Sequence, residues 1–362
     1  MHIAIIGLPN SSKTTVFNAL TRGNHDTTAF SSGQFEVHTE TVDVPDSRVE
    51  RLQAMFQPRK TTFAQVTYAD IAGLVKGISQ KGLSGPLLNT ISQSDALLHV
   101  VRAFEDPTMP HEEGNVDPMR DIAIVDTELL LSDLIVVERR IERLQAGLKK
   151  GGDKQAKAVS EVELSLFLRL LETLNYDTPL RDMDFTPAEV KMLRNFGLLT
   201  LKPTLIVLNI GDGSSEAALG LVSGYRHRRS TIAFLQGRIE MELAQMPPEE
   251  AAEFLAAYGI EEPGLNRIID LSYTLLGLQS FFTVGEDEVR AWTVPIGATA
   301  VEAAGTIHSD LARGFIRAEV ISCDALIRAG SLASARQNGL LRLEGKDYVV
   351  QNGDILNIRF NV

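Results

Sequence analysis

The sequence has one cysteine, one tryptophan, no long apolar run and no excess of basic charge. Cys323, the lone cysteine, cannot form an internal disulfide, so packing must hold the fold and we expect a buried, inert thiol. No stretch approaches the ~20 consecutive apolar residues of a membrane-spanning helix, so no membrane partner is expected. The 35 lysine and arginine residues face 47 acidic residues, a net charge of −12, so contact with nucleic acid has to be local.

The remaining composition is that of an ordinary globular protein. With 362 residues, 44% of them hydrophobic and 23% charged, the chain is long enough for two or three domains. Residues 1–7 are apolar from the start and lack the basic segment and the cleavage site of a secretory signal. We therefore expect a cytoplasmic location.

Short apolar runs alternate with helical patterns over much of the chain. Residues 14–20 have the spacing of a helix. The runs typical of buried strands are His2–Ile6, Gln65–Asp70, Leu97–Arg102, Thr204–Asn209 and Thr231–Leu235. Because continuous apolar strands separated by helices are typical of parallel sheets covered on both faces, the pattern predicts an α/β fold with a mainly parallel sheet.

Two other patterns interrupt and follow this α/β region. Apolar residues recur at three- and four-residue spacing on both sides of Gly151-Gly152-Asp153, which predicts an inserted antiparallel helical hairpin. Near the C-terminus, alternating strands predict a small α+β domain, with a β-hairpin turn at Asn352-Gly353-Asp354. The predicted domains are residues 1–120 with 200–277 for the α/β domain, 121–199 for the helical insertion, and 278–362 for the C-terminal domain.

The strongest functional signal is the segment Gly7-Leu8-Pro9-Asn10-Ser11-Ser12-Lys13-Thr14-Thr15, between a predicted strand and a predicted helix. In a phosphate-binding loop of this kind, backbone N–H groups and the positive end of the helix point at phosphates. Lys13 adds a positive charge, and the Thr14 hydroxyl is a ligand for Mg²⁺. The short side chain of Asn10 tolerates left-handed backbone angles. The predicted nucleotide-binding residues here are Asn10, Ser11, Ser12, Lys13, Thr14 and Thr15.

Ser12 departs from the usual pattern G-x-x-x-x-G-K-[S/T], which has glycine at this position. Its Cβ either crowds the backbone against the phosphates and weakens binding, or its hydroxyl serves as a further donor. A third interpretation is a strand–turn–helix loop that keeps its shape after losing its ligand. The sequence leaves these interpretations open, and we favour retained nucleotide binding.

Two later segments follow strands in the order expected of a nucleotide-binding domain. Asp70 stands where a carboxylate reaches Mg²⁺, and Gly73 stands where a backbone N–H senses the terminal phosphate. Leu74 replaces the glutamine that positions water in many GTPases, so we assign no catalytic residue and expect slow hydrolysis. Asn209 and Asp212 are the candidate base-contacting residues, in a motif that lacks the lysine of the guanine-selective form N-K-x-D. The sequence therefore does not decide between ATP and GTP.

These motifs and several others resemble the YchF family of Obg-related P-loop NTPases over nearly the whole chain. The segments that carry the resemblance are Gly7–Thr15, Asp70–Gly77, Asp95–Val101, Gly151–Lys154, Glu261–Ile268, Phe281–Thr283, Val289–Thr293, Gly314–Val320, Glu344–Tyr348 and Phe360–Val362. The resemblance implies a P-loop domain with an inserted helical coiled coil and a C-terminal β-grasp-like TGS domain. It also implies a nucleotide-dependent protein with Mg²⁺ as cofactor, which associates with the ribosome and prefers ATP to GTP.

The chain departs from the family's pattern at several nucleotide-contacting positions. Beyond Ser12, these are Asp212 for a glutamate, Gln34 for a switch threonine that meets Mg²⁺, and Gln236-Gly237-Arg238 for a segment S-A-K. Two hypotheses follow. The first is a slow ATPase, with GTP as an alternative substrate, whose nucleotide state controls docking on the ribosome. The second is a scaffold that has lost nucleotide chemistry and acts through its helical insertion and TGS-like domain.

A cluster of basic residues lies in the predicted helical insertion. Its members are Arg139, Arg140, Arg143, Lys149, Lys150, Lys154 and Lys157. A basic tip on a projecting hairpin suits contact with RNA phosphates, and the resemblance makes the ribosome or its RNA the expected partner, whereas DNA is not expected. The alternative is an ordinary solvated helix face, because no aromatic residue is interleaved for base stacking.

Overall fold

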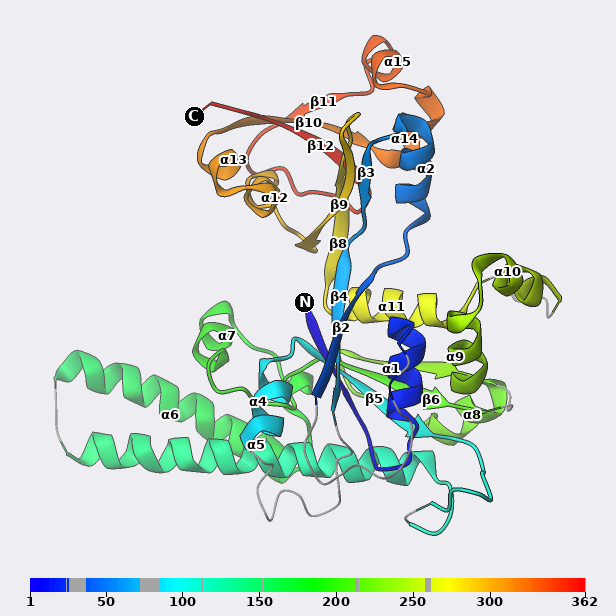
Figure 1. Ribbon diagram of the computed structural model, residues 1–362. Helices are drawn as coiled ribbons and strands as arrows, with labels where there is room; N and C mark the ends of the chain where they lie inside the picture. The colour runs from blue at the N-terminus through cyan, green and yellow to red at the C-terminus, as the bar shows by residue number, and fades with distance from the viewer. Residues whose placement is uncertain are drawn as a thin grey trace. The chain divides into compact units, whose positions relative to one another are not determined.

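The structure is a computed structural model that describes residues 1–23, 25, 37–71, 85–111, 113–150, 153–211, 215–257 and 262–361 (Figure 1). The chain divides into two units. The first unit comprises Met1–Glu40 and Thr67–Ile268, and the second comprises Thr41–Val66 and Ile269–Val362. Residues 41–66 thus join the C-terminal unit, although we expected them in the α/β domain, and the helical insertion belongs to the first unit. The division into three domains stays a prediction.

The first unit is built on a sheet with the strand order β2-β4-β1-β5-β6-β7. From β4 to β7 in this order, neighbouring strands run parallel, which confirms the predicted α/β fold. β5 and β6 are buried along their whole length because their apolar side chains lie between two layers of helices. The strands are β1 (His2–Ile6), β2 (Val37–Asp43), β4 (Gln65–Ile71), β5 (Ala96–Arg102), β6 (Thr204–Asn209) and β7 (Ser230–Leu235).

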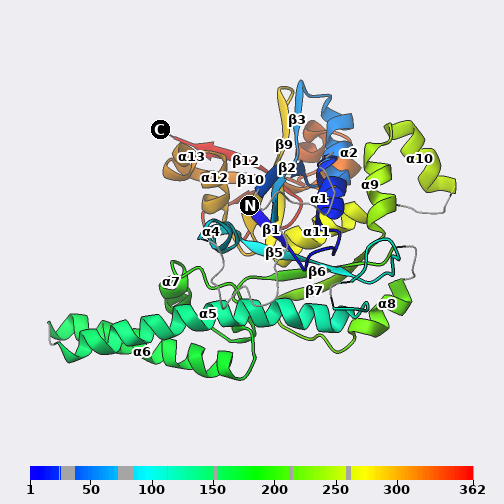
Figure 2. The same cartoon turned by 60° about the horizontal axis from the view of Figure 1, so that its bottom comes forward.

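Helices cover both faces of this sheet (Figures 1 and 2). On one face, Ile91 of α4 and Val125 of α5 pack with Ala4 and Leu97 of the sheet. On the other face, α1 packs against α9. The helices of this unit are α1 (Lys13–Thr21), α4 (Gly85–Gln93), α5 (Pro118–Lys149), α8 (Ser215–Val222), α9 (Gly237–Gln245) and α10 (Pro248–Ala257). The helix α11 (Gly264–Leu275) begins in the first unit and ends in the second.

α5 extends beyond the sheet and packs side by side with α6 (Lys154–Asn175), as Figure 2 shows. The short elements η1 (Leu180–Asp182) and α7 (Pro187–Leu193) follow. The predicted apolar stripe is buried at positions such as Ile141 and Leu170, whereas Val159 and Val162 are 58% and 57% exposed. The apolar contact therefore stops short of the start of α6. None of the described helices is both long enough and apolar enough to cross a membrane.

The second unit contains a mixed sheet with the strand order β11-β10-β12-β8-β9-β3. Its parallel pairs are β12 with β8 and β3 with β9, and its other pairs are antiparallel. The strands are β3 (Lys60–Thr62), β8 (Leu278–Thr283), β9 (Glu288–Pro295), β10 (Phe315–Ser322), β11 (Arg342–Glu344) and β12 (Asp354–Phe360). The helices are α2 (Ser47–Phe56), α12 (Ala300–Ile307), α13 (Ser309–Arg313), α14 (Cys323–Ala329) and α15 (Leu332–Gln337).

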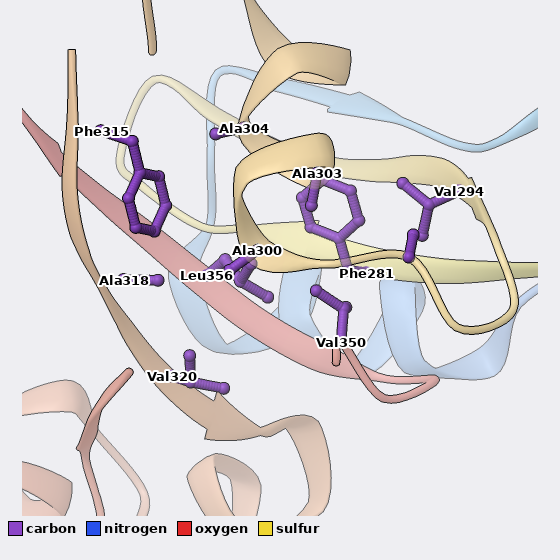
Figure 3. Packing of buried hydrophobic residues seen from close by; sticks show 11 residues of the cluster. Phe281, Val294, Ala300, Ala303, Ala304, Phe315, Ala318, Val320, Val350 and Leu356 are labelled. Carbon is purple, nitrogen blue, oxygen red and sulfur yellow. The ribbon is translucent and has the colours of Figure 1, made fainter. Parts of the chain in front are cut away.

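The core of the second unit lies between this sheet and α12. Phe281 of β8 and Phe315 of β10 pack with Ala300 and Ala304 of the helix (Figure 3). Small alanine side chains let the helix backbone approach the sheet closely, and the two rings fill the space beside it. Cys323 is buried as expected, and burial raises the pKa of its thiol to about 11.

The prediction of a β-hairpin at Asn352-Gly353-Asp354 is wrong. Gly353 does adopt a positive φ of 90°, so the turn signal itself is correct. Residues before the turn form no strand paired with β12, however: Val349 makes an isolated bridge to Thr299 instead. Because β12 pairs with β10 and β8, distant partners rather than the preceding residues complete the sheet.

Candidate nucleotide-binding site

The loop that joins β1 to α1 has a backbone that few residues tolerate. Gly7 lies so close to β5 that a Cβ there would stand 2.4 Å from the carbonyl oxygen of Val100. Asn10 and Ser12 have positive φ angles of 58° and 69°, and the expectation of left-handed angles at Asn10 is confirmed. The loop thus curves around the N-terminus of α1, where helix N–H groups are available to an anion.

Ser12 keeps the conformation that glycine adopts without strain. It precedes α1 with φ 69° and ψ 32°, its side chain makes no capping hydrogen bond, and it lines a cleft described below. A left-handed conformation costs an L-residue about 1 kcal/mol, so the rest of the loop must hold Ser12 in a backbone conformation that serine by itself disfavours. Its neighbour Ser11 is 4% exposed, and the Ser11 Oγ has no hydrogen-bond partner among the described residues.

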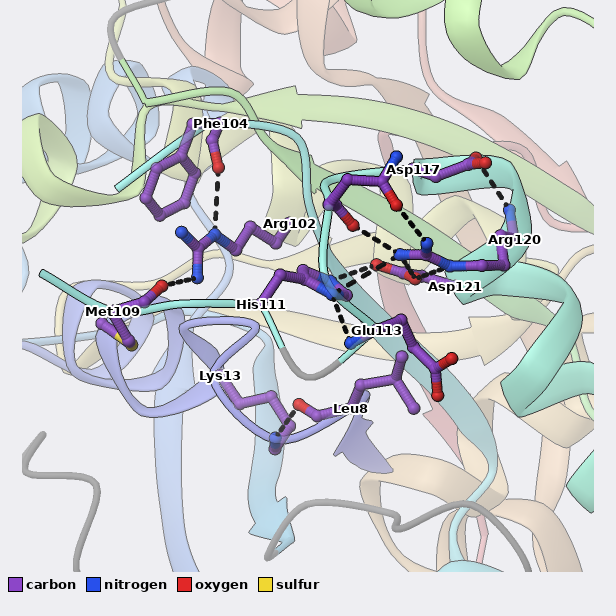
Figure 4. Close-up of polar contacts among 11 residues, drawn as sticks. Leu8, Lys13, Arg102, Phe104, Met109, His111, Glu113, Asp117, Arg120 and Asp121 are labelled. Carbon is purple, nitrogen blue, oxygen red and sulfur yellow. Dashed lines mark hydrogen bonds and ion pairs between the residues drawn. The ribbon is translucent and has the colours of Figure 1, made fainter. Parts of the chain in front are cut away.

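Lys13 folds over the loop at the first residue of α1. Its Nζ donates a hydrogen bond to the carbonyl oxygen of Leu8 at 2.8 Å (Figure 4), and the residue is 8% exposed. The positive end of a helix disfavours a neighbouring cation and stabilises anions. A lysine held here therefore suits a site that receives negatively charged phosphates.

Thr14 and Asp70, the two predicted Mg²⁺ ligands, lie within hydrogen-bond distance of each other. The Thr14 hydroxyl donates to Asp70 Oδ2 at 3.0 Å, whereas Asp70 Oδ1 is buried with no partner among the described residues. Burial raises the pKa of the Asp70 carboxyl. One hydroxyl and one carboxylate match the few protein oxygen ligands that Mg²⁺ takes beside substrate phosphates. In the described part of the chain no cluster of three or more His, Cys, Asp or Glu side chains is placed to hold a metal alone.

A cleft of about 700 Å³ opens beside this loop in the first unit. Because β1, β5 and β6 run parallel, the loops that follow them meet at one edge of the sheet, where α/β proteins bind ligands. The residues that line the cleft are Ser12, Thr15, Ala103, Phe104, Glu105, Asp106, Pro107, Met109, Asn209, Ile210, Gly211, Arg238 and Met241.

The segment 103–109 forms much of this wall, and sequence reasoning missed it. Arg102 at the end of β5 is 2% exposed and donates to the carbonyl oxygens of Phe104 and Met109 at 2.9 and 2.8 Å (Figure 4). Its guanidinium also lies over the Phe104 ring, 4.9 Å from the centroid. An arginine at the end of an apolar strand was the available signal, because a buried cation needs acceptors nearby.

Asn209 joins two loops of the cleft. Its Oδ1 accepts hydrogen bonds from the N–H groups of Gly237 at 3.0 Å and Gly211 at 3.4 Å, and the residue is 3% exposed. The side chain thus lies in the cleft wall and positions the loops after β6 and β7. Of the other predicted positions, Gly73, Leu74, Gln34 and Asp212 lie outside the described residues and stay predictions.

A polar cluster that no motif indicated follows the 103–109 segment. His111 Nε2 lies 2.8 Å from Asp121 Oδ2, and Arg120 donates to Asp121 Oδ1 through Nε and Nη2 at 3.1 and 2.9 Å (Figure 4). The Asp117 carboxylate caps α5 by accepting from the Arg120 N–H at 3.1 Å. These contacts tie the cleft wall to the start of α5.

The basic residues of the helical insertion do not share one environment. Arg140 makes two hydrogen bonds of 2.8 Å to the Glu163 carboxylate, and its guanidinium lies 5.5 Å from the centroid of the Phe196 ring. Arg140 is therefore engaged within the hairpin. Of the other members of the basic cluster, Arg139, Arg143, Lys149, Lys150 and Lys154 are exposed, and Lys157 is half-buried.

Two family models match the chain. The model YchF-GTPase_C, described as "Protein of unknown function (DUF933)", matches residues 278–361. The model MMR_HSR1, described as "50S ribosome-binding GTPase", matches residues 2–137. The second match includes the phosphate loop, Asp70 and the 103–109 segment.

Solved and curated relatives match over nearly the full length. The protein of Pasteurella multocida named "Ribosome-binding ATPase YchF" is 42% identical over 99% of this chain and 98% of its own length. The Bacillus subtilis protein of the same name is 40% identical with the same coverage. The Schizosaccharomyces pombe YchF GTPase structure has a TM-score of 0.83 at 28% identity, covering 99% of this chain and 97% of that one. With this identity over almost the whole of both chains, the protein is a member of the YchF family.

Proposed function

We propose that the protein binds a purine nucleoside triphosphate with Mg²⁺ in this cleft and hydrolyses it slowly. The observation that carries the proposal is the hydrogen bond between Thr14 and Asp70, beside an Asp70 oxygen that is buried and unpartnered among the described residues. A buried carboxylate oxygen without a donor is costly, and a divalent cation removes that cost. The phosphate loop supplies the anion-binding groups next to it.

Each residue of the loop has a proposed role. The N–H groups of residues 10–15 and the start of α1 hold the phosphates, and Lys13 Nζ exchanges its bond to the Leu8 carbonyl for the β- and γ-phosphate oxygens. Mg²⁺ supplies neutralisation of the phosphate charge when bound, with Thr14 and Asp70 as its protein ligands. Gly73 is the proposed sensor of the terminal phosphate.

The base occupies the part of the cleft that Phe104 and the loop after β6 line. Phe104 offers an aromatic surface there, and Asn209 holds the loop in place. Asp212 is the proposed acceptor for base protons. Ile210 takes the place of the lysine in the guanine-selective motif and is 6% exposed. We propose ATP as the preferred nucleotide and GTP as the second, in line with the name of the curated relatives.

Hydrolysis is proposed to be slow. Leu74 follows the proposed phosphate sensor where a water-positioning glutamine stands in fast GTPases, and an aliphatic side chain cannot orient water. The nucleotide state would then persist long enough to control binding of a partner.

The partner that we propose is the ribosome, which the name of the curated relatives gives for them, and the location that we propose is the cytoplasm. The proposed contact is the basic end of the α5–α6 pair, through Arg139, Arg143, Lys149, Lys150 and Lys154, with a smaller share for Lys157. Arg140 contributes less because Glu163 already neutralises it. We also propose that α5 and α6 form a coiled coil and that the second unit is a TGS domain of the β-grasp type.

A second candidate is a scaffold that binds no nucleotide. It is favoured by the side chain of Ser12, which adds atoms to the cleft wall where glycine has none. Calorimetric titration with non-hydrolysable ATP and GTP analogues separates the two. Saturable binding that is tighter for the ATP analogue supports the first proposal. Absence of heat with either analogue, from folded and nucleotide-free protein, overturns it in favour of the scaffold.

A further inference from the structure

Strand β12 is paired along its whole length on one side and at a single position on the other. β10 pairs with it from Asp354 to Phe360. β8 pairs with it only where Ile355 lies opposite Phe282, because β8 ends at Thr283. Within residues 278–361, which the structure describes without a gap, the C-terminal half of β12 therefore has an open edge.

The backbone groups of Ile358 and Phe360 point toward this open edge. The N–H of Asn361 donates to the carbonyl oxygen of Gly314, on the side of β10, at 2.9 Å. Because backbone groups alternate in direction along a strand, the N–H and C=O of the even-numbered residues face away from β10. An unpaired strand edge is a template for another extended chain.

A mainly apolar groove of about 320 Å³ lies at this edge, and residues from both faces of the sheet line it. Ile307 of α12 and Leu311 of α13 line it together with Ile358 and Phe360, and Figure 1 shows the two helices beside β12. Phe360 is 45% exposed. A strand added here would place every second side chain in this groove, because side chains alternate between the faces of a sheet.

The opposite face of the same edge carries basic side chains beside apolar ones such as Ile321 and Leu332. Arg317 lies directly opposite Arg359 in the register of β10 and β12, and Arg336 of α15 is nearby. The side chains of Arg336 and Arg359 are 61% and 57% exposed, and both pair with the buried Glu319 carboxylate. Two guanidinium groups thus share one carboxylate, and the exposed Arg317 lies opposite one of them. Like charges placed opposite each other are unfavourable unless an anion joins them.

We propose that this edge binds an extended acidic peptide segment of a partner protein as an additional strand. Its backbone pairs with Ile358 and Phe360, its apolar side chains fill the groove, and its alternating carboxylates face Arg336 and Arg359. The charge of the basic face selects an acidic rather than a basic segment. The site does not depend on the nucleotide cleft.

The test uses the full-length protein and fluorescein-labelled decapeptides. The probe consists of alternating valine and glutamate. One control alternates valine with lysine, and the other has the composition of the probe in the order Val-Val-Glu-Glu. The proposal expects saturable binding of the probe alone, measured by fluorescence anisotropy, and slower hydrogen exchange of the amides of Ile358 and Phe360 when it is bound.

A matched pair of variants tests the strand pairing itself. Phe360→Pro removes an N–H that faces the open edge and leaves the bonds to β10, whereas Phe360→Ala removes the ring and keeps the N–H. The probe should bind the proline variant about tenfold more weakly than the alanine variant. Arg359→Ala, which leaves the strand backbone intact, should also weaken binding of the probe.

Several outcomes would overturn the proposal. Absence of saturable binding by the probe, equal binding of the lysine control, or equal affinities of folded proline and alanine variants would each do so. A single-stranded RNA that displaces the probe and loses affinity in the Arg359→Ala variant would assign this face to nucleic acid instead. Thermal unfolding followed by circular dichroism establishes that each variant is folded.

Discussion

Thr14 and Asp70 are joined by a hydrogen bond of 3.0 Å from Thr14 Oγ1 to Asp70 Oδ2, although 56 positions separate them in the sequence. The bond connects the start of α1 to the end of β4, so the phosphate loop and the proposed metal ligand are held at a defined separation. Asp70 Oδ1 is buried without a partner among the described residues. This arrangement supports the proposal that the site receives a cation.

Lys13→Ala is expected to abolish nucleotide binding. Lys13 is the cation of the phosphate loop, and its loss removes a charge-assisted hydrogen bond in a buried setting, which weakens affinity about a hundredfold or more. Calorimetry with the ATP analogue measures the change. Lys191→Ala, an exposed position on α7, is the control. Unchanged affinity in the Lys13 variant would show that the loop does not hold the phosphates.

Ser12→Gly is expected to raise nucleotide affinity several-fold. The φ of 69° suits glycine, and the substitution removes a Cβ that faces the cleft. Thermal stability should change little, because the relief of strain and the added flexibility of the unfolded chain oppose each other. Ser12→Val, which branches at Cβ, should abolish binding. Weaker binding in the glycine variant would instead identify the serine hydroxyl as a donor.

Asp133 is expected to make the folded protein more stable at low pH, which is unusual for a carboxyl group. The buried carboxylate accepts hydrogen bonds from the N–H groups of Leu199 and Thr200 at 2.7 and 2.8 Å, and burial raises its pKa to about 6. Between about pH 4 and pH 6 the folded protein therefore binds this proton more tightly than the unfolded chain does. The stabilisation from this group falls as pH rises through that window.

Asp133→Asn tests this assignment by denaturant unfolding. The amide lacks the titration and turns an N–H₂ group toward an N–H donor, which costs roughly 2–4 kcal/mol of unfolding free energy. The difference in unfolding free energy between wild type and variant should be larger near pH 4 than near pH 7. A difference that stays constant across this range would mean that Asp133 has an ordinary pKa.

Arg140 and Arg143 should respond differently to substitution by alanine. Arg140→Ala breaks the ion pair with Glu163 and should lower the unfolding free energy by about 1 kcal/mol with little effect on ribosome binding. Arg143→Ala, at an exposed position, should leave stability unchanged and reduce the salt dependence of ribosome binding by about one counterion. Ribosome cosedimentation at several salt concentrations measures ribosome binding by the two variants. Equal effects on binding would place the contact elsewhere.

Local signals were sufficient to predict the central sheet and the phosphate loop. The apolar run Thr204–Asn209 coincides with β6, since a strand buried on both faces leaves an unbroken apolar pattern in the sequence. Asn10 could be assigned left-handed angles because few residues tolerate them. The motifs assigned Thr14 and Asp70 to one site. The two residues lie close together because β1 and β4, which precede and contain them, are adjacent parallel strands.

Features that depend on distant partners were not predicted. β3 pairs with β9, more than 200 positions away, so nothing near residues 60–62 indicates that they complete the C-terminal sheet. The role of Asn209 as a bridge between loops depends on Gly237, which only the parallel neighbour β7 brings near. The 103–109 wall likewise has no motif, because Arg102 holds it through backbone oxygens that any sequence would offer.

The most direct test is calorimetric titration of wild type and Asp70→Asn with a non-hydrolysable ATP analogue, with and without Mg²⁺. The asparagine keeps the shape of the side chain and removes the charge that attracts the cation. Wild type should bind at least about tenfold more tightly with Mg²⁺ than without it, and the variant should show no such gain. Equal affinities of wild type with and without Mg²⁺, or a full Mg²⁺ effect in the variant, would contradict the proposed metal–nucleotide site.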